Sequence, residues 1–186
     1  MKIFVIGGKA KSGKNTFGEK LKKHLIDYGY KPCIMHITEP LYTYAKNYFM
    51  YDAKNDEKPR EFLQKMGTEI IKEKMGKKEF LLNRLYEDIE ILSNFFFFFL
   101  ITDARLIHEF ESIKEKYQDV VLIKLERKHY NDKLTEEERN HITEKEIDAY
   151  NNFDYIIENK NLDDLNIKAL EVVRNEENYE GELIWV

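Results

Sequence analysis

Residues 3–16 read IFVIGGKAKSGKNT and join a short apolar run to a segment rich in glycine and lysine. The pattern G-x-x-x-x-G-K spans Gly8 to Lys14, directly after the apolar run and directly before a helical pattern. Glycines let the backbone curl so that successive N–H groups point at a phosphate, and the N-terminus of the following helix adds a favourable potential. The stretch therefore predicts a strand, a phosphate-binding loop and a helix, in that order.

The residues of this loop have separate predicted roles. Lys14 would supply a positive charge for the β- and γ-phosphates of ATP. The next position usually carries a Ser or Thr that binds Mg²⁺, but here it is Asn15, followed by Thr16. Either side-chain oxygen suits Mg²⁺, and the sequence leaves open which one binds it. The residues predicted to bind the nucleotide are Gly8, Lys11, Ser12, Gly13, Lys14, Asn15 and Thr16.

Five apolar runs are expected to form a parallel sheet, because continuous apolar runs suit strands that helices cover on both faces. They are Ile3–Ile6, Pro32–Ile37, Phe95–Thr102, Val120–Leu125 and Tyr155–Glu158. Amphipathic stretches predict helices over Asn15–Gly29, Pro40–Phe49, Pro59–Met75, Phe80–Leu92, Leu106–Tyr117 and Leu162–Val173. The five consecutive phenylalanines, Phe95–Phe99, are expected to lie in the central, fully buried strand. The predicted fold is a three-layer α/β sandwich of the P-loop NTPase class, with a five-stranded parallel sheet.

Length and composition suit one P-loop domain spanning residues 1–186. The formal net charge of −5 argues against a surface that binds a nucleic-acid polymer. The single cysteine, Cys33, excludes an internal disulfide and favours a reducing cytoplasm. The apolar runs are too short for a signal peptide or a membrane span, so no membrane partner is expected.

Two regions outside the loop are candidates for substrate contacts. Residues 127–146 are dense in charge and lie between the last two predicted strands, where a solvated excursion or a mobile lid over the phosphates is expected. Residues 38–92 would carry the acceptor-binding helices. There Arg60 and Gln64 share a helical face that Thr68 continues, and this face is either an acceptor site or an ordinary polar surface.

Asp103 ends the third predicted strand. A carboxylate at that edge of an open α/β sheet can hold Mg²⁺ through water, although it could instead cap the next helix. Arg105 lies at the same rim, and fixed cations such as Arg127 and Arg139 would offset the repulsion between two anionic substrates. The predicted catalytic residues are Lys14, Asp103, Arg105 and Arg127, and the predicted metal ligands are Asn15, Thr16 and Asp103.

Several stretches occur in the order seen in the deoxynucleoside monophosphate kinases of phages and bacteria, and the chain resembles this family from Met1 to about Val173. They are GKAKSGKNT, EPLYTYAKNYF, REFLQKMGTE, ITDARLIHE and HITEKEIDAYNNFDYIIEN. The family usually reads D-V-R-F-x-N-E at the third strand. This sequence keeps Asp103, Arg105 and Glu109 but has Ala104, Leu106 and His108 in between.

The resemblance implies a kinase that uses ATP and Mg²⁺, a small phosphorylated acceptor, usually a deoxynucleoside monophosphate, and often a homodimer. It places Arg127 and His141 near the lid. The residues expected to bind the acceptor are Arg60, Gln64, Thr68, Arg105, Arg139 and His141. Two alternatives stay open: a kinase of the phosphomevalonate or dephospho-coenzyme A type, and a non-catalytic ATP-binding regulatory module.

Overall fold

A computed structural model describes residues 1–51, 60–127 and 147–176. The chain forms two compact units. The first, called here the sheet unit, comprises Met1–Met35 and Ser93–Val186, and the second, the helical unit, is His36–Leu92. The expectation of one domain over residues 1–186 stays a prediction. No helix within the described ranges combines the length and the hydrophobicity needed to span a bilayer.

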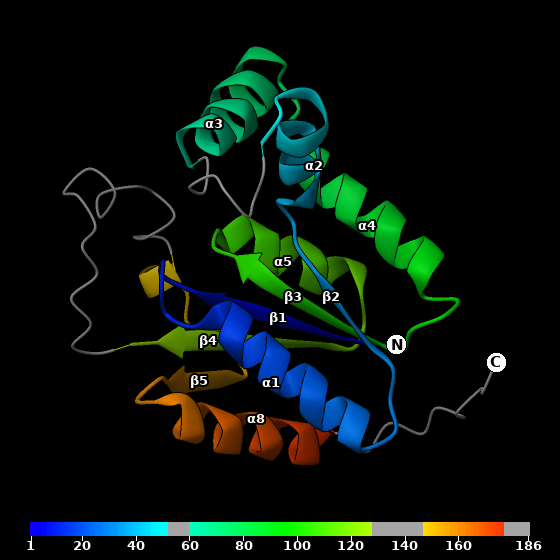
Figure 1. Ribbon diagram of the computed structural model, residues 1–186, viewed down its shortest axis with the longest axis vertical. Helices are drawn as coiled ribbons and strands as arrows, with labels where there is room; N and C mark the ends of the chain where they lie inside the picture. Colours follow the sequence, from blue (N-terminus) through cyan, green and yellow to red (C-terminus); the bar gives the residue numbers. More distant parts are fainter. Residues whose placement is uncertain (52–59, 128–146, 177–186) are drawn as a thin grey trace. The chain divides into compact units, whose positions relative to one another are not determined.

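The sheet unit contains five strands in the order β2-β3-β1-β4-β5, and every neighbouring pair is parallel (Figure 1). This confirms the predicted five-stranded parallel sheet. The strands are β1 (Lys2–Gly8), β2 (Pro32–Met35), β3 (Phe98–Ala104), β4 (Val120–Glu126) and β5 (Tyr155–Glu158). The order places β1 in the middle, so the loop that follows it opens at the point where the chain switches direction across the sheet.

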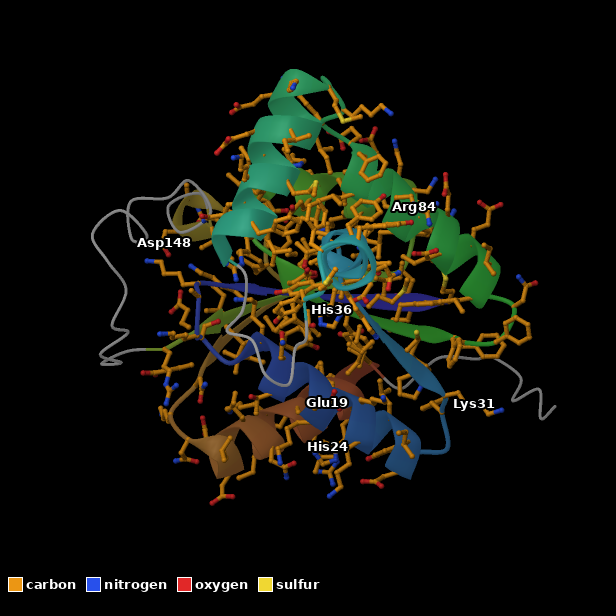
Figure 2. All side chains as sticks on the ribbon, turned by 45° about the horizontal axis from the view of Figure 1, so that its top comes forward. Glu19, His24, Lys31, His36, Arg84 and Asp148 are labelled. Atoms are coloured by element: carbon orange, nitrogen blue, oxygen red, sulfur yellow. The ribbon has the colours of Figure 1, made fainter. Side chains whose placement is uncertain are left out.

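Helices cover both faces of the sheet. Helices α1 (Lys14–Asp27) and α8 (Leu162–Glu176) lie against one face, and α5 (Ile107–Lys116) lies against the other (Figure 1). Alternate strand residues point to opposite faces. Phe4 and Ile6 of β1 therefore join the core formed with α1 and α8. Between these two helices, Nε2 of His24 lies 3.2 Å from the backbone and side-chain oxygens of Asn166 (Figure 2).

Only part of the phenylalanine run, Phe95–Phe99, lies in a buried strand. Phe98 and Phe99 are completely buried in β3, but Phe95 is 67% exposed. The partner strands explain this boundary, since Lys2 of β1 and Pro32 of β2 both pair with Phe98 and neither strand extends further back. The expectation that this run forms the central strand was wrong, because β1 occupies the centre and β3 lies beside it.

The helical unit comprises α2 (Glu39–Tyr48), α3 (Arg60–Gln64), η1 (Lys65–Lys74) and α4 (Phe80–Leu92). The α4 bounds match the prediction. The helix expected from Pro59 to Met75 instead changes type, because η1 is a π-helix in which each N–H reaches five residues back. The Met75 N–H, for example, donates to the Ile70 carbonyl at 2.9 Å.

Gly18 lets α1 approach the sheet closely. A Cβ added at Gly18 would lie 2.5 Å from Cγ2 of Thr102 in β3. We expect Gly18→Ala to lower the free energy of unfolding by about 1–2 kcal/mol, because overpacking outweighs the better helix propensity of alanine. Urea denaturation measures this change. In a Thr102→Ser background, which removes Cγ2, the same substitution should cost much less, and equal costs in both backgrounds would contradict the predicted contact.

Candidate phosphate-binding site

The segment between β1 and α1 forms a tight loop whose backbone only some residues can adopt. Gly13 has a φ of +104°, and Lys11 has a φ of +60°, a left-handed conformation that non-glycine residues rarely adopt. A Cβ at Gly8 would lie 2.5 Å from Oγ of Ser12 and 2.6 Å from the carbonyl oxygen of Leu125. The glycines of the motif are thus required by close approach and by backbone conformation.

Lys14 is the first residue of α1, and its side chain folds back into the loop. Its Nζ donates hydrogen bonds to the carbonyl oxygens of Gly8 at 2.7 Å and Lys9 at 2.8 Å. The residue is buried, with only 7% of its surface exposed. A buried ammonium inside a curled loop at a helix N-terminus provides a strong positive potential for an anion.

Ser12 supplies the observation that tests whether a phosphate fits here. The residue is 3% exposed, and its Oγ has no hydrogen-bond partner among the residues that the structure describes. A buried hydroxyl in a native protein normally has a partner, and a phosphate oxygen would provide one. The loop therefore fits the phosphates of a nucleotide.

The strand register places Asp103 beside the start of this loop. Gly7 of β1 pairs with Ala104 of β3, and Asp103 is the residue before Ala104. Both positions lie at the carboxyl edge of the sheet, where open α/β sheets bind their ligands. Asp103 is partly buried. Among the alternatives, the role of helix cap does not fall to Asp103, because the N-cap residue of α5 is Leu106.

A buried carboxylate shapes the turn that carries Arg105. Oε2 of Glu109 accepts hydrogen bonds from the backbone N–H groups of Arg105 at 2.8 Å and Leu106 at 3.1 Å. Glu109 is 9% exposed and lies in the first turn of α5, where a negative charge is favourable. In the sequence, Glu109 matches the family pattern, but nothing there indicates its role. It fixes the backbone that positions Arg105 at the rim.

An ion-pair network links the loop to the segment before β5. Nζ of Lys9 lies 2.6 Å from Asp148 (labelled in Figure 2), and the same carboxylate lies 3.7 Å from Nζ of Lys124. Lys124 also pairs with Glu126 at 2.9 Å. Arg127 follows β4 at the same edge and is exposed. Sequence reasoning missed this network, since its members come from three separate segments.

The side-chain oxygens at this edge of the sheet suit a magnesium ion. Asn15 and Thr16 are exposed in the first turn of α1, and Asp103 ends the neighbouring strand. Amide, hydroxyl and carboxylate oxygens are hard ligands, and Mg²⁺ typically takes one or two carboxylates and completes its shell with water and substrate phosphates. Within the described ranges no three His, Cys, Asp or Glu side chains cluster around a common point. Such an ion would take its remaining ligands from water and the nucleotide phosphates.

Apart from Arg105, the residues predicted to bind the acceptor lie in other segments of the chain. Arg60 begins α3, Gln64 ends it half-buried, and Thr68 is exposed on η1. Because η1 is a π-helix, the spacing that aligns Arg60 with Gln64 does not carry over unchanged to Thr68. Arg139 and His141 lie outside the described residues, as does nearly all of the predicted lid.

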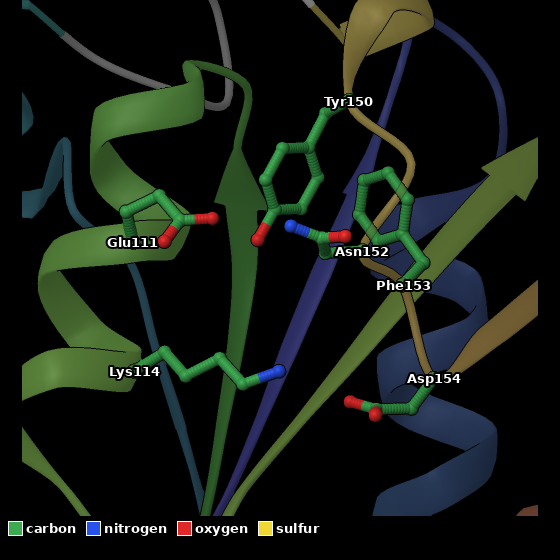
Figure 3. A pocket seen from close by; sticks show the side chains of 6 residues that line it. All are labelled: Glu111, Lys114, Tyr150, Asn152, Phe153 and Asp154. Carbon is green, nitrogen blue, oxygen red and sulfur yellow. The ribbon is translucent and has the colours of Figure 1, made fainter.

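A pocket of about 370 Å³ lies between α5 and the segment before β5 (Figure 3). Its lining is Glu111, Lys114, Tyr150, Asn152, Phe153 and Asp154. The Tyr150 ring stacks on Phe110, with ring centroids 5.5 Å apart. Burial, and then the nearby Glu111 carboxylate, raise the pKa of Tyr150. None of the predicted site residues within the described ranges lines this pocket, so it is not assigned to the nucleotide.

Comparisons with solved structures show the fold. The APS kinase CysC of Mycobacterium tuberculosis, as a point mutant, superposes with a TM-score of 0.56 at 12% identity, over 95% of this chain and 99% of that chain. The same enzyme in complex with AMPPNP and APS superposes with a TM-score of 0.53 at 12% identity, over 95% of this chain and 98% of that chain. A sugar kinase from Janibacter sp. HTCC2649 superposes with a TM-score of 0.50 at 10% identity, over 97% of this chain and 96% of that chain. These likenesses confirm the predicted α/β fold.

Comparisons of sequence show the family. No curated protein sequence matches the chain. The family description "Deoxynucleotide monophosphate kinase" matches residues 36–169, well over half of the chain. The phosphate loop lies before the matched residues, so its geometry and the family match are separate observations that agree. The chain belongs to the deoxynucleotide monophosphate kinase family and is an ATP-using phosphotransferase.

Proposed function

We propose that this kinase transfers the γ-phosphate of ATP to a deoxynucleoside monophosphate, giving ADP and the deoxynucleoside diphosphate. The observation that carries the proposal is the family match over residues 36–169, which includes the whole of the helical unit. The phosphate loop supports the donor side of the reaction, since Ser12 and Lys14 offer buried groups of the kind that a triphosphate satisfies.

The proposed donor site uses the loop to fix the triphosphate. Backbone N–H groups between Gly8 and Lys14 would surround the β-phosphate, with the positive end of α1 behind them. The Lys14 ammonium would move from the carbonyl oxygens of Gly8 and Lys9 to the β- and γ-phosphates. That exchange of partners keeps a buried cation satisfied both with and without nucleotide.

The chemical step requires alignment and neutralisation of charge more than proton transfer. An oxygen of the acceptor phosphate attacks the γ-phosphorus, and the bond from that phosphorus to the bridging oxygen of ADP breaks. The attacking oxygen is already anionic, so it needs no strong general base. Arg105 and Arg127 are proposed to offset the repulsion between the two substrates at the carboxyl edge of the sheet. Magnesium, held with help from Asn15 or Thr16 and Asp103, would neutralise further charge on the phosphates.

The remaining assignments are part of the same proposal. Arg60, Gln64 and Thr68 would bind the acceptor, together with Arg105, Arg139 and His141, and residues 127–146 would close over the phosphates. Closure would exclude water and so limit hydrolysis of ATP. A homodimer, a single functional domain and a cytoplasmic location remain predictions.

The proposal is tested by incubating the purified protein with ATP, Mg²⁺ and one nucleoside monophosphate at a time, and by measuring ADP. We expect ADP formation to rise at least about 100-fold above the acceptor-free rate with one or more deoxynucleoside monophosphates, because a positioned acceptor phosphate competes with water. Matched ribonucleotides serve as controls for the sugar. Phosphomevalonate and dephospho-coenzyme A belong in the same panel, and turnover with either of them alone would contradict the proposed acceptor.

A further inference from the structure

Asn159 lies directly after β5 and is buried against the phosphate loop. It is 8% exposed, and its backbone N–H donates to the carbonyl oxygen of Glu126 at the end of β4, at 2.7 Å. Its side-chain Nδ2 donates to the carbonyl oxygen of Ser12 at 2.9 Å. The residue therefore joins the end of β4 to the phosphate loop, through its backbone N–H on one side and its buried side-chain amide on the other.

The contact with Ser12 fixes the direction of a peptide plane. In a planar trans peptide the carbonyl and the following N–H point in opposite directions. Because the Ser12 carbonyl points at Asn159, the N–H of Gly13 points away from it. The Ser12 N–H donates in turn to the Lys9 carbonyl at 3.2 Å, so the loop is held on both sides of Ser12.

Asn159 also limits which residue can occupy position 13. A Cβ at Gly13 would lie 2.5 Å from Nδ2 of Asn159 and 3.7 Å from Cδ1 of Leu165. The φ of +104° at Gly13 already disfavours other residues. Backbone conformation and packing thus act together at this position. The amide group of Asn159 serves as one wall of the loop as well as a donor to it.

From this arrangement we infer that Asn159 is a positioning residue for the ATP site. It orients the Ser12–Gly13 peptide so that the Gly13 N–H faces the phosphates, without touching the nucleotide itself. Donors that point at the phosphates before binding need no reorganisation when the charge arrives, which is the source of their catalytic value. The inference rests on the proposed function only in taking ATP as the occupant of the loop.

The test compares Asn159→Ala and Asn159→Asp with the wild-type protein. We expect Asn159→Ala to raise the KM for ATP and the Kd for AMPPNP about tenfold, while the KM for the acceptor stays within about twofold, since one oriented donor is lost on the ATP side alone. Asn159→Asp should be worse, about 100-fold, because it sets a carboxylate against the Ser12 carbonyl and adds negative charge near the phosphates. Steady-state kinetics and calorimetric titration measure these values.

Asn161→Ala is the matched control. Asn161 is two positions away, and its side chain also bonds the backbone, but there its Oδ1 accepts from the N–H of Asp164 at 2.9 Å, at the start of α8 rather than at the loop. It should lower the Tm through loss of a helix cap and leave the KM for ATP unchanged. A merely structural Asn159 would give the same pattern as Asn161→Ala, and that result would overturn the inference.

The two proposals can fail separately. If the wild-type protein binds AMPPNP but no nucleoside monophosphate stimulates turnover, the proposed function fails, and the Kd values for the Asn159 variants still decide the inference. If the wild-type protein shows acceptor-dependent turnover and Asn159→Ala has an unchanged KM for ATP, the inference fails alone. If the wild-type protein does not bind AMPPNP, both are overturned.

Discussion

Lys14→Ala is expected to lower kcat/KM for ATP by about 10³-fold or more. Removal of a single preorganised donor from a site that stabilises developing charge typically costs about 10²–10³-fold in kcat. Lys14 should exceed this range because its group is a full positive charge, buried at 7% exposure inside the loop. Initial rates at varied ATP, with the preferred acceptor held at saturation, measure the change.

The same substitution should also destabilise the protein without nucleotide. Without the ammonium, the buried carbonyl oxygen of Gly8 loses the donor at 2.7 Å, whereas the Lys9 carbonyl loses the one at 2.8 Å but keeps the Ser12 N–H at 3.2 Å. Unsatisfied buried groups cost about 1–3 kcal/mol. Thermal unfolding of the free protein separates this effect from the loss of catalysis, and it shows whether the variant is folded at the assay temperature.

Lys23→Ala is a suitable control, because Lys23 lies on the same helix and is exposed. It removes the same charge from α1 and should change kcat/KM by less than about twofold, since an exposed charge is largely screened. Lys14→Arg provides a second comparison. It keeps the charge but replaces a compact ammonium by a planar group, and it should recover only a small part of the activity. A Lys14→Ala variant with more than a tenth of the wild-type kcat/KM would contradict the assigned role.

The loop could be predicted from the sequence because its chemistry is local. Gly8, Gly13 and Lys14 lie within seven consecutive residues, and their spacing alone specifies a curl with a cation inside it. The order of strands and helices was predictable for a similar reason, since each element carries its own apolar pattern. The bounds of α4 and β5 coincide with the predicted ones.

The supporting contacts could not be predicted because they join distant parts of the chain. Asn159 and Ser12 are 147 positions apart, and nothing near either residue indicates the other. The start of β3 depends on where its partners β1 and β2 begin, so the exposure of Phe95 is not a property of the phenylalanine run. The π-helix η1 is a further case, because a change in hydrogen-bond spacing leaves the apolar pattern nearly unaltered.

These two classes of residue have different consequences for function. The chemistry of phosphate binding determines which residues touch the nucleotide, so the sequence motif identifies them. Asn159 fixes the backbone of the phosphate loop and Glu109 fixes the turn that carries Arg105, and only the folded chain shows these contacts. Their substitution should therefore change the affinity for one substrate, while the substitution of a residue such as Lys14 removes the reaction itself.

Asp103→Asn is expected to lower kcat by about 10²-fold and to raise the Mg²⁺ concentration needed for half-maximal rate. The substitution is nearly isosteric, so β3 should be retained. It removes the negative charge that we assign to the metal at the carboxyl edge, beside the Gly7–Ala104 pair. The measurement is the initial rate over a range of free Mg²⁺ at constant ATP. Excess Mg²⁺ should restore part of the activity of the variant, because a weakened ligand set is compensated by mass action.

Asp119→Asn is the control that isolates position from charge. Asp119 directly precedes β4, so it lies at the opposite, amino edge of the parallel sheet, where it is 3.6 Å from Nζ of Lys2. It removes the same charge from the same unit and should leave the Mg²⁺ dependence unchanged. If both variants shift the dependence equally, the effect is one of overall charge. If Asp103→Asn leaves the Mg²⁺ dependence at its wild-type value, Asp103 does not hold the metal, and Asn15 or Thr16 must do so with the phosphates alone.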